Sequence, residues 1–275
     1  MVTISAFADE ISSDLEEQVR VLRDEGIAHL ELRSVWNKNV LDLSDNEVEE
    51  IRRTLRANGI QVSAIGSPIG KVELTVDFDV YMEKFQRTID LAEYFGAQYI
   101  RIFSFFMPKG RSPDGFREPV MARMKRLVEA AEARDVTLLH ENEKGIYGDT
   151  PERCLDILQS CASSTLRAAF DPANFVQCGV RPFTEALPVL HPFVAYVHIK
   201  DARFADGGVV PAGQGDGQVR EVLAALLDGG YRGFLSIEPH LAAAGRYGGF
   251  SGPELFHVAA DALKALLIEL HCPWN

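Results

Sequence analysis

Short apolar runs alternate with longer amphipathic stretches about eight times along the chain. The apolar runs are rich in Ile, Val, Leu and Phe without clean polar alternation, which is typical of strands covered on both faces. They predict strands near residues 3–8, 28–33, 61–66, 98–103, 136–141, 167–171, 194–199 and 234–238. The amphipathic stretches between them predict helices.

Several predicted helices carry recognisable end signals. Helix starts are indicated by the capping-box patterns Ser13-x-x-Glu16 and Ser44-x-x-Glu47 and by Thr150-Pro151, which places Pro at the first helical position. Helix ends are indicated by glycines just before predicted strands, at Gly26, Gly59 and Gly96. Strand, helix and turn signals therefore follow one another in a regular order.

The repeated strand–helix units predict an α/β fold, a closed (β/α)₈ TIM barrel that forms a single domain over residues 1–275. Such a barrel needs about 250 residues. The alternative is an open doubly wound sheet, but the first strand is followed by Phe7-Ala8-Asp9-Glu10-Ile11 rather than a GxGxxG turn. The Gly-rich stretch 245–252 after the last strand is expected to be a long loop and a candidate mobile lid.

Composition narrows the class of protein. Hydrophobic residues make up 47% and charged residues 25%, as in soluble globular proteins, and the net charge of −12 disfavours nucleic acid as a partner. The four cysteines form no CxxC pair and are expected to be reduced thiols. No basic leader segment and no apolar run near 18 residues is found, so no signal peptide, no membrane partner and a cytoplasmic location are expected.

Metal-ligand residue types stand at the ends of four consecutive predicted strands. They are Glu141, Asp171, His198 and Glu238. The C-terminal ends of barrel strands open on one face, so these side chains are expected to meet. A lone Asp before Pro often caps a helix and a lone His is often a core residue, but four in succession indicate a metal site. Three carboxylates and one imidazole suit Mn²⁺, Mg²⁺ or Co²⁺, with Zn²⁺ as an alternative.

This ligand set suggests a type of chemistry. A divalent cation polarises carbonyl and hydroxyl oxygens and stabilises an enediolate. Proton transfer beside the carbonyl then needs a base on one face and an acid on the other. Glu141 and Glu238 lie on predicted strands three steps apart, so they are the candidate catalytic pair.

Several segments match a known pattern. They are His-Glu-Asn at 140–142, Phe-Asp-Pro-Ala-Asn-Phe at 170–175, Val-His-Ile-Lys-Asp-Ala at 197–202, Gly-Gln-Gly-Asp-Gly at 213–217, Ser-Ile-Glu-Pro-His at 236–240, Phe-Ala-Asp-Glu-Ile at 7–11, Glu-Leu-Arg at 31–33 and Ser-Pro-Ile-Gly-Lys at 67–71. The chain thus resembles the sugar phosphate isomerase/epimerase group of the xylose-isomerase-like barrel superfamily. The resemblance implies that Glu141, Asp171, His198 and Glu238 bind the metal, and that Glu141 and Glu238 are the acid/base pair.

Three positions depart from the ketose 3-epimerases of that superfamily. Asn174 stands where they usually carry His, Tyr147 where they carry a second Glu, and Phe204 where they carry Arg. Inosose dehydratases and hydroxypyruvate isomerases share the superfamily, so a dehydratase of an inosose-type ketone is an alternative, as is a catalytically silent metal- or sugar-binding barrel. The extra His ligands of the three-zinc apurinic endonucleases are missing.

The expected activity is isomerisation or epimerisation of a small sugar, sugar phosphate or polyol-derived ketone. The candidate substrate-binding residues are Arg33, Lys71, Asn174, Lys200 and Arg203. The basic ones can hold a hydroxyl, carboxylate or phosphate, or can be ordinary salt-bridged side chains. A small carbohydrate is the expected partner, and a homodimer is left open.

Overall fold

The centre of the fold is a sheet of eight parallel strands, seen in a computed structural model that describes residues 1–242 and 251–275. In chain order the strands are β1 (Thr3–Ala6), β2 (His29–Leu32), β5 (Gln61–Ile65), β6 (Tyr99–Ile102), β7 (Thr137–Glu141), β8 (Leu166–Phe170), β9 (Val194–Ile199) and β12 (Phe234–Ile237). Each strand begins and ends within two residues of its predicted range.

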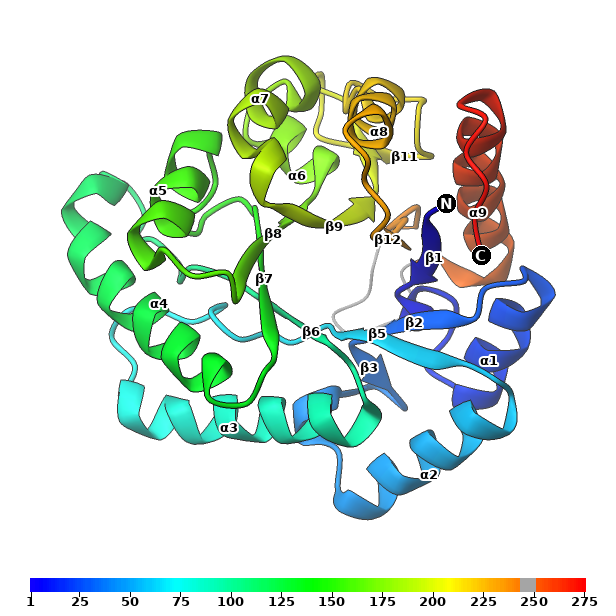
Figure 1. The fold of residues 1–275 in the computed structure, drawn as a ribbon, viewed down its shortest axis with the longest axis horizontal. Helices are drawn as coiled ribbons and strands as arrows, with labels where there is room; N and C mark the ends of the chain where they lie inside the picture. The colour runs from blue at the N-terminus through cyan, green and yellow to red at the C-terminus, as the bar shows by residue number, and fades with distance from the viewer. Residues whose placement is uncertain (243–250) are drawn as a thin grey trace.

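The strands are arranged around a ring in chain order. Hydrogen-bonded neighbours follow the order β1-β12-β9-β8-β7-β6-β5-β2, and the end strands β1 and β2 lie side by side, which curls the sheet into a near-closed barrel (Figure 1). A doubly wound sheet would instead reverse its strand order at a switch point. The predicted TIM barrel is therefore confirmed.

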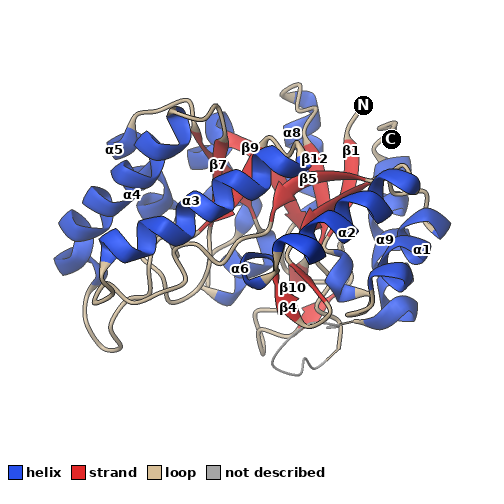
Figure 2. Ribbon diagram, turned by 90° about the horizontal axis from the view of Figure 1, so that it is seen from below, coloured by secondary structure: helices blue, strands red, loops and turns tan. Residues whose placement is uncertain are grey.

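Helices follow the strands and surround the barrel (Figures 1 and 2). They are α1 (Leu15–Asp24), α2 (Asp45–Ala57), α3 (Phe78–Phe95), α4 (Arg117–Glu132), α5 (Pro151–Cys161), α6 (Pro172–Gln177), α7 (Leu187–Leu190), α8 (Val219–Asp228) and α9 (Gly252–Glu269). Short helical turns are η1 (Ala8–Glu10), η2 (Val40–Asp42), η3 (Pro113–Phe116), η4 (Pro182–Ala186) and η5 (His191–Phe193).

Two small antiparallel ladders lie in the loops that follow barrel strands. One pairs β3 (Ser34–Val35) with β4 (Lys38–Asn39), and the other pairs β10 (Asp201–Ala202) with β11 (Val209–Val210). In Figure 2, β4 and β10 lie at one end of the barrel and both termini lie at the other. The end with the ladders is therefore the end at which the barrel strands finish.

Two of the three predicted helix starts are confirmed. Ser44 forms the predicted capping box with Glu47, and Thr150 caps α5 with Pro in its first turn. The prediction for Ser13 is wrong by one residue, because the side chain of Asp14 accepts the hydrogen bond from the Glu17 N–H. A carboxylate is favoured there because the N-terminal end of a helix is electropositive. The three helix-ending glycines adopt positive φ as expected.

The space between barrel and helices is filled by apolar side chains. Fully buried examples come from five helices: Leu22, Ile51, Phe85, Leu127 and Leu263. Burying a side chain of this size stabilises the fold by about 1.5–3 kcal/mol. Each helix thus presents an apolar face to the strands, as the amphipathic pattern predicts.

The interior of the barrel is unusually polar. Ser63 on β5 lies 2.7 Å from Ser5 on β1 and 2.9 Å from Tyr196 on β9, measured between hydroxyl oxygens, and all three side chains are buried. These strands are not neighbours in the sheet, so the side chains meet inside the barrel. Barrel interiors are usually filled by Val, Ile and Leu. The polar interior therefore points to a functional reason for the departure.

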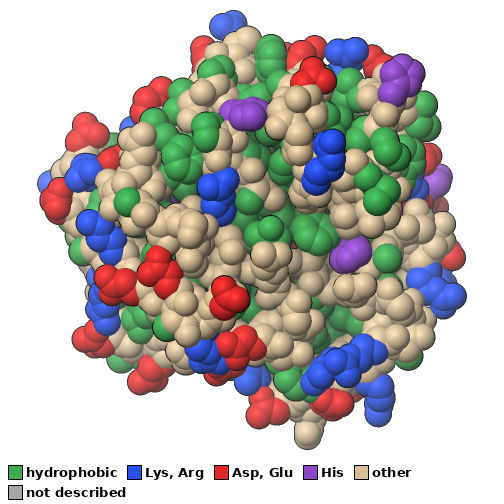
Figure 3. Space-filling model, viewed as in Figure 1, with side chains coloured by type: hydrophobic (Ala, Val, Ile, Leu, Met, Phe, Trp, Pro, Cys, Tyr) green, Lys and Arg blue, Asp and Glu red, His purple; other side chains and the backbone are tan. Residues whose placement is uncertain are grey.

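Charged side chains of both signs lie on the surface of the protein. On the face drawn in Figure 3, Lys and Arg side chains lie among Asp and Glu side chains around the rim, and hydrophobic and uncharged side chains occupy the centre. Within residues 1–242 and 251–275, no helix is long and apolar enough to cross a membrane. Most of the predicted loop 245–252 lies outside the described residues.

Candidate metal centre

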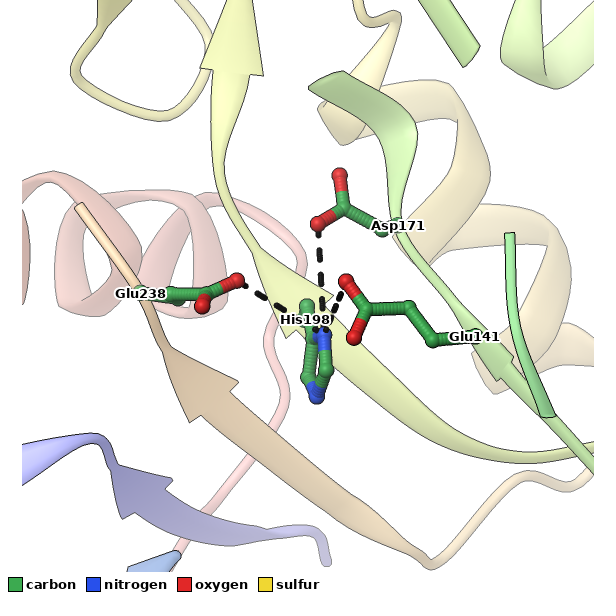
Figure 4. A group of neighbouring side chains, drawn as sticks. All are labelled: Glu141, Asp171, His198 and Glu238. Carbon is green, nitrogen blue, oxygen red and sulfur yellow. Dashed lines mark ion pairs between the residues drawn. The ribbon is translucent and has the colours of Figure 1, made fainter. Parts of the chain in front are cut away.

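Four side chains converge at the end of the barrel where the strands finish (Figure 4). Glu141 ends β7, Asp171 directly follows β8, His198 lies in β9 and Glu238 directly follows β12. All four are at most 2% exposed, and each offers one ligand atom within 4.8 Å of the others. The four residues that the sequence singles out are thus brought together, and their cluster fits a divalent metal ion.

The imidazole of His198 is aimed at the three carboxylates. Its Nδ1 atom lies 3.3 Å from Glu141 Oε1, 3.8 Å from Glu238 Oε2 and 3.9 Å from Asp171 Oδ2. This buried nitrogen has no hydrogen-bond partner among the residues described. A nitrogen facing three carboxylate oxygens is a donor set that a divalent cation would satisfy.

Asp171 has two functions at once. Its Oδ1 atom accepts a hydrogen bond of 2.8 Å from the backbone N–H of Asn174 and so caps α6. The Asn142 side chain bonds both the backbone N–H and the carbonyl of Asp171. These contacts fix the carboxylate, while its Oδ2 atom faces the cluster. Helix capping and metal binding are therefore compatible roles for this residue.

Buried cations offset the repulsion between the three carboxylates. Lys200 Nζ lies 2.8 Å from Asp171 Oδ2 and 3.0 Å from Glu238 Oε2. Arg101 Nη1 lies 3.1 Å from Glu141 Oε2. Because all five side chains are nearly inaccessible to water, these attractions are weakly screened. The carboxylates are thereby held close together in a low-dielectric interior.

The balance of burial and charge differs between the carboxyl groups. Burial raises the pKa of Asp171 to about 6, with repulsion from Glu141 adding to the rise and Lys200 opposing it. Burial also acts to raise the pKa of Glu141, but attraction from His198 and Arg101 brings that pKa well below its ordinary value. Glu141 is thus ionised over the physiological pH range.

Arg33 holds the carboxylate of Glu238 through its Oε1 atom. Its guanidinium contacts Glu238 Oε1 at 2.7 Å, Asp9 Oδ2 at 2.7 Å and Glu10 Oε1 at 2.8 Å. His240 Nε2 reaches the same pair, 3.0 Å from Glu10 Oε1 and 3.4 Å from Glu238 Oε1. The structure therefore places Arg33 in a carboxylate clamp that orients Glu238.

The remaining candidate substrate residues occupy different places. Asn174 donates a 2.9 Å hydrogen bond to Glu141 Oε1 and is buried. The side chain of Lys71 is 35% exposed and pairs with Glu143 at the rim. Arg203 is exposed, and within the described part of the chain it makes no ion pair or side-chain hydrogen bond with the cluster. The structure thus gathers Lys200 and Asn174 at the cluster and leaves Lys71 and Arg203 further out.

Sequence reasoning missed part of this network. Glu31 is fully buried, and its Oε2 atom lies 3.2 Å from His198 Nε2. Asp9 and Glu10 enter the sequence analysis only as part of the segment 7–11, and the ion pair of Arg101 with Glu141 is not predicted. A usable signal was present, because Glu31 lies between two leucines and Arg101 between two isoleucines of predicted strands, where burial without a partner is costly.

Adding a divalent cation to chelator-treated protein is expected to raise the melting temperature. A ligand at 100 times its dissociation constant stabilises the folded state by about 2.7 kcal/mol. For a domain of this size this corresponds to a shift of about 5–10 °C. Differential scanning fluorimetry with Mn²⁺, Mg²⁺, Co²⁺ and Zn²⁺ measures it.

The control variants for this shift are chosen for matched chemistry. Asp171→Asn should reduce the shift, whereas Asp135→Asn, which makes the same change at an exposed residue, should keep it. No shift with any of the four cations would contradict the assignment of the cluster as a metal centre.

Part of the chain is similar in sequence to a known protein. An uncharacterized protein of Methanocaldococcus jannaschii is 31% identical over 119 residues, which cover 42% of this chain and 41% of the relative. The match thus spans less than half of that relative's length. It identifies a similar protein without adding a function.

Solved structures share the fold over nearly the whole chain. A D-tagatose 3-epimerase-like protein has a TM-score of 0.79 at 17% identity, covering 98% of both chains. The probable 3-DHS dehydratase AsbF of Bacillus anthracis has a TM-score of 0.76 at 18% identity, covering 96% of this chain and 99% of its own. The IolI protein with a bound zinc atom has a TM-score of 0.75 at 14% identity, covering 98% of both.

A family model describes the chain more directly. The model for the xylose isomerase-like TIM barrel matches residues 19–266, which include the whole metal cluster. This agrees with the resemblance carried by the strand-end motifs. The chain therefore belongs to the xylose isomerase-like TIM barrel family.

Proposed function

We propose that this protein is a divalent-metal-dependent isomerase or epimerase of a small ketose or polyol-derived ketone. The observation that carries the proposal is the buried cluster of three carboxylates around His198 Nδ1, at the end of the barrel where such enzymes act. A bound cation would polarise the substrate carbonyl and stabilise the enediolate. The protein side chains must then move a proton at the neighbouring carbon.

Glu141 and Glu238 are the proposed acid/base pair. They lie on opposite sides of the Asp171–His198 part of the ring, on strands three steps apart in the barrel. One carboxylate removes a proton from one face of the substrate, and the other returns a proton on the opposite face. Asn174 holds Glu141 and Arg33 holds Glu238, so both groups are oriented in advance.

The neighbouring proteins support the reaction class in different ways. The D-tagatose 3-epimerase-like barrel favours epimerisation, and the probable dehydratase keeps dehydration as the alternative. Tyr147, which stands where ketose 3-epimerases carry a second Glu, donates a 2.8 Å hydrogen bond to Asp156 instead. We therefore do not assign a ketose 3-epimerase in particular. The zinc-containing neighbour is the reason to test Zn²⁺ beside Mn²⁺, Mg²⁺ and Co²⁺.

An unphosphorylated substrate fits the charges of the described site best. Arg33, Arg101 and Lys200 are each already paired with carboxylates of the site. A phosphate group would have to compete with these carboxylates for its cations. We propose Lys200 as a contact to a substrate hydroxyl or carbonyl and Lys71 as a rim contact, with Arg203 as a further rim candidate.

Deuterium exchange tests this function. Chelator-treated protein in D₂O is mixed with ketoses, inososes, hydroxypyruvate and the matching sugar phosphates, with and without each cation, and followed by NMR. The expected result is metal-dependent loss of one proton signal beside the carbonyl of an unphosphorylated substrate. A new epimer or isomer identifies an isomerase, and an unsaturated product identifies a dehydratase.

Controls make a negative result informative. The same protein without cation should show no exchange, since the carbonyl is then not polarised. Metal binding in the calorimeter with no exchange on any substrate would contradict the isomerase proposal and favour a binding protein. Exchange limited to sugar phosphates would contradict the unphosphorylated substrate alone.

A further inference from the structure

One buried carboxylate near the metal cluster is not among its ligands. Glu31 lies on β2 and is 0% exposed. It lies across the His198 ring from the cluster, with its Oε2 atom 3.2 Å from Nε2, whereas Nδ1 faces the three carboxylates. A carboxylate costs several kcal/mol to bury without a partner. Its place on the far side of the histidine therefore calls for an explanation.

The backbone is irregular where Glu31 enters the barrel. The register between β2 and β5 shifts at Leu30/Glu31, because Leu30 pairs with Val62 and Glu31 with Ala64. Ser63 is the extra residue on β5. Bulges of this kind are common beside active sites, where they redirect a side chain. The shift thus accompanies the turn of the Glu31 carboxylate toward His198.

The hydroxyl groups of Ser63, Tyr196 and Ser5 form hydrogen bonds with one another. Ser63 Oγ donates to the Leu30 carbonyl at 3.0 Å, so its single hydrogen is used there, and it must accept from Tyr196 and Ser5. The Oε1 atom of Glu31 has no hydrogen-bond partner among the described residues. The hydrogen bond that remains for this carboxylate is the one from His198 Nε2.

The His198 ring is also held in its plane. Phe7 packs edge-on against it with ring centroids 5.2 Å apart, and Tyr196 does so at 5.8 Å. The ring therefore cannot exchange its two nitrogens without disturbing buried aromatic side chains. Its orientation and its hydrogen bond to Glu31 are set together.

We propose that Glu31 is a positioning residue for the metal centre, accepting a hydrogen bond from Nε2–H of His198 and so leaving Nδ1 free to bind the cation. A neutral imidazole carries its hydrogen on one nitrogen alone, and an ionised carboxylate can only accept. The partner of Nε2 thus decides which nitrogen is the ligand. This inference rests on the metal centre of the proposed function and adds the group that selects its histidine tautomer.

Glu31→Gln tests the role with little change in shape. Removing such a partner lowers metal affinity by about 10- to 100-fold, so the dissociation constant for Mn²⁺ in isothermal titration calorimetry should rise by that factor. The visible spectrum of the Co²⁺-loaded variant should differ from wild type, since the ligand field at Nδ1 changes. Glu152→Gln is the matched control, because it makes the same change at an exposed residue of α5, and it should keep the wild-type affinity and spectrum.

The outcomes separate this role from others. A Glu31→Gln protein with wild-type Mn²⁺ affinity and Co²⁺ spectrum would overturn the proposal and leave Glu31 a structural ion-pair partner. Equal losses in Glu31→Gln and Glu152→Gln would also overturn it, since the loss would then not depend on the contact with His198. Wild-type protein that binds no divalent ion would overturn the metal centre itself, and this role with it.

A measurement on wild-type protein decides the matter if the variant does not fold. Two-bond ¹H–¹⁵N couplings of histidine-labelled, Zn²⁺-loaded protein report which ring nitrogen carries hydrogen. The expected result is a hydrogen on Nε2 of His198 and none on Nδ1, with His198→Gln used to assign the signal. A hydrogen on Nδ1 in the metal-loaded protein would refute the proposal.

Discussion

Epimerisation or isomerisation of the substrate found by exchange is expected to fall by about 10²- to 10⁴-fold when Glu238 is replaced by glutamine. The glutamine keeps the size of the side chain and one carbonyl oxygen, but it cannot accept or return the proton. Inversion at a carbon needs both carboxylates, one on each face. A single remaining base can act on one face alone.

The same variant should retain part of the chemistry if the reaction is an epimerisation. Glu141 remains ionised, held by Arg101 and Asn174. It should still exchange solvent deuterium into the epimer whose proton faces it, without forming the other epimer. Glu141→Gln should show the mirror result, with exchange confined to the second epimer. NMR of each pure epimer in D₂O, at metal concentrations that saturate each variant, measures both rates.

The control for this pair is Glu152→Gln, an exposed residue in the first turn of α5 that should react like wild type. Loss of exchange from both faces in both variants, although metal remains bound, would contradict a two-base mechanism. Equal residual exchange from both faces in one variant would show that the other carboxylate is the sole acid/base group. Either result would change the catalytic roles proposed for Glu141 and Glu238.

The strands and the four cluster residues were predictable because they depend on local pattern. Apolar runs such as 194–199 mark strands, and the rule that barrel strands finish on one face brings Glu141, Asp171, His198 and Glu238 together. No contact has to be known for this inference. Spacing along the chain and the direction of the strands are sufficient.

The groups that hold the ligands were not predictable in the same way. Arg33 is predicted as a substrate-binding residue, but the sequence gives its charge without its partners, and it pairs with Asp9, Glu10 and Glu238. His240 ends the Ser-Ile-Glu-Pro-His segment at 236–240, and no pattern in the sequence indicates its contacts with Glu10 and Glu238. The Arg33–Glu238 and His240–Glu10 contacts join residues more than 200 positions apart in the chain and therefore require the fold itself.

Glu31 illustrates the same limit more sharply. Its strand was predicted, yet the register shift opposite Ser63 is a tertiary feature that no local pattern encodes. Strict alternation along β2 does not identify His198 as its partner, because β2 and β9 are not neighbours in the sheet. A charged residue between two leucines is visible in the sequence, but its partner His198 is known only from the folded barrel.

Replacing Gly70 by alanine is expected to destabilise the protein by about 2–5 kcal/mol, the sum of left-handed backbone strain and a steric clash. Gly70 has φ of +89°, and an added Cβ atom would lie 2.0 Å from the Phe103 carbonyl oxygen. That carbonyl belongs to the backbone at the end of β6 and has little room to move. Thermal unfolding followed by circular dichroism should show a fall of at least 5 °C.

Gly26→Ala separates the two causes. Gly26 has φ of +69°, but an added Cβ would meet no atom within 4 Å, so this variant bears the backbone strain alone and should lose about 1 kcal/mol. Equal losses in the two variants would show that the close approach at Phe103 is unimportant. A much larger loss at Gly70 would attribute the difference to that contact.

The contact at Gly70 also connects stability with the proposed chemistry. Gly70 and its neighbour Ile69 hydrogen-bond to Phe105 and Phe103, which fastens the loop after β5 to the end of β6. The same strand carries Arg101, which holds Glu141. Folded Gly70→Ala protein is therefore expected to lose metal-dependent exchange as well as stability, whereas Gly26→Ala should retain its activity. A Gly70→Ala protein with wild-type exchange would show that the Arg101–Glu141 pair does not depend on this loop.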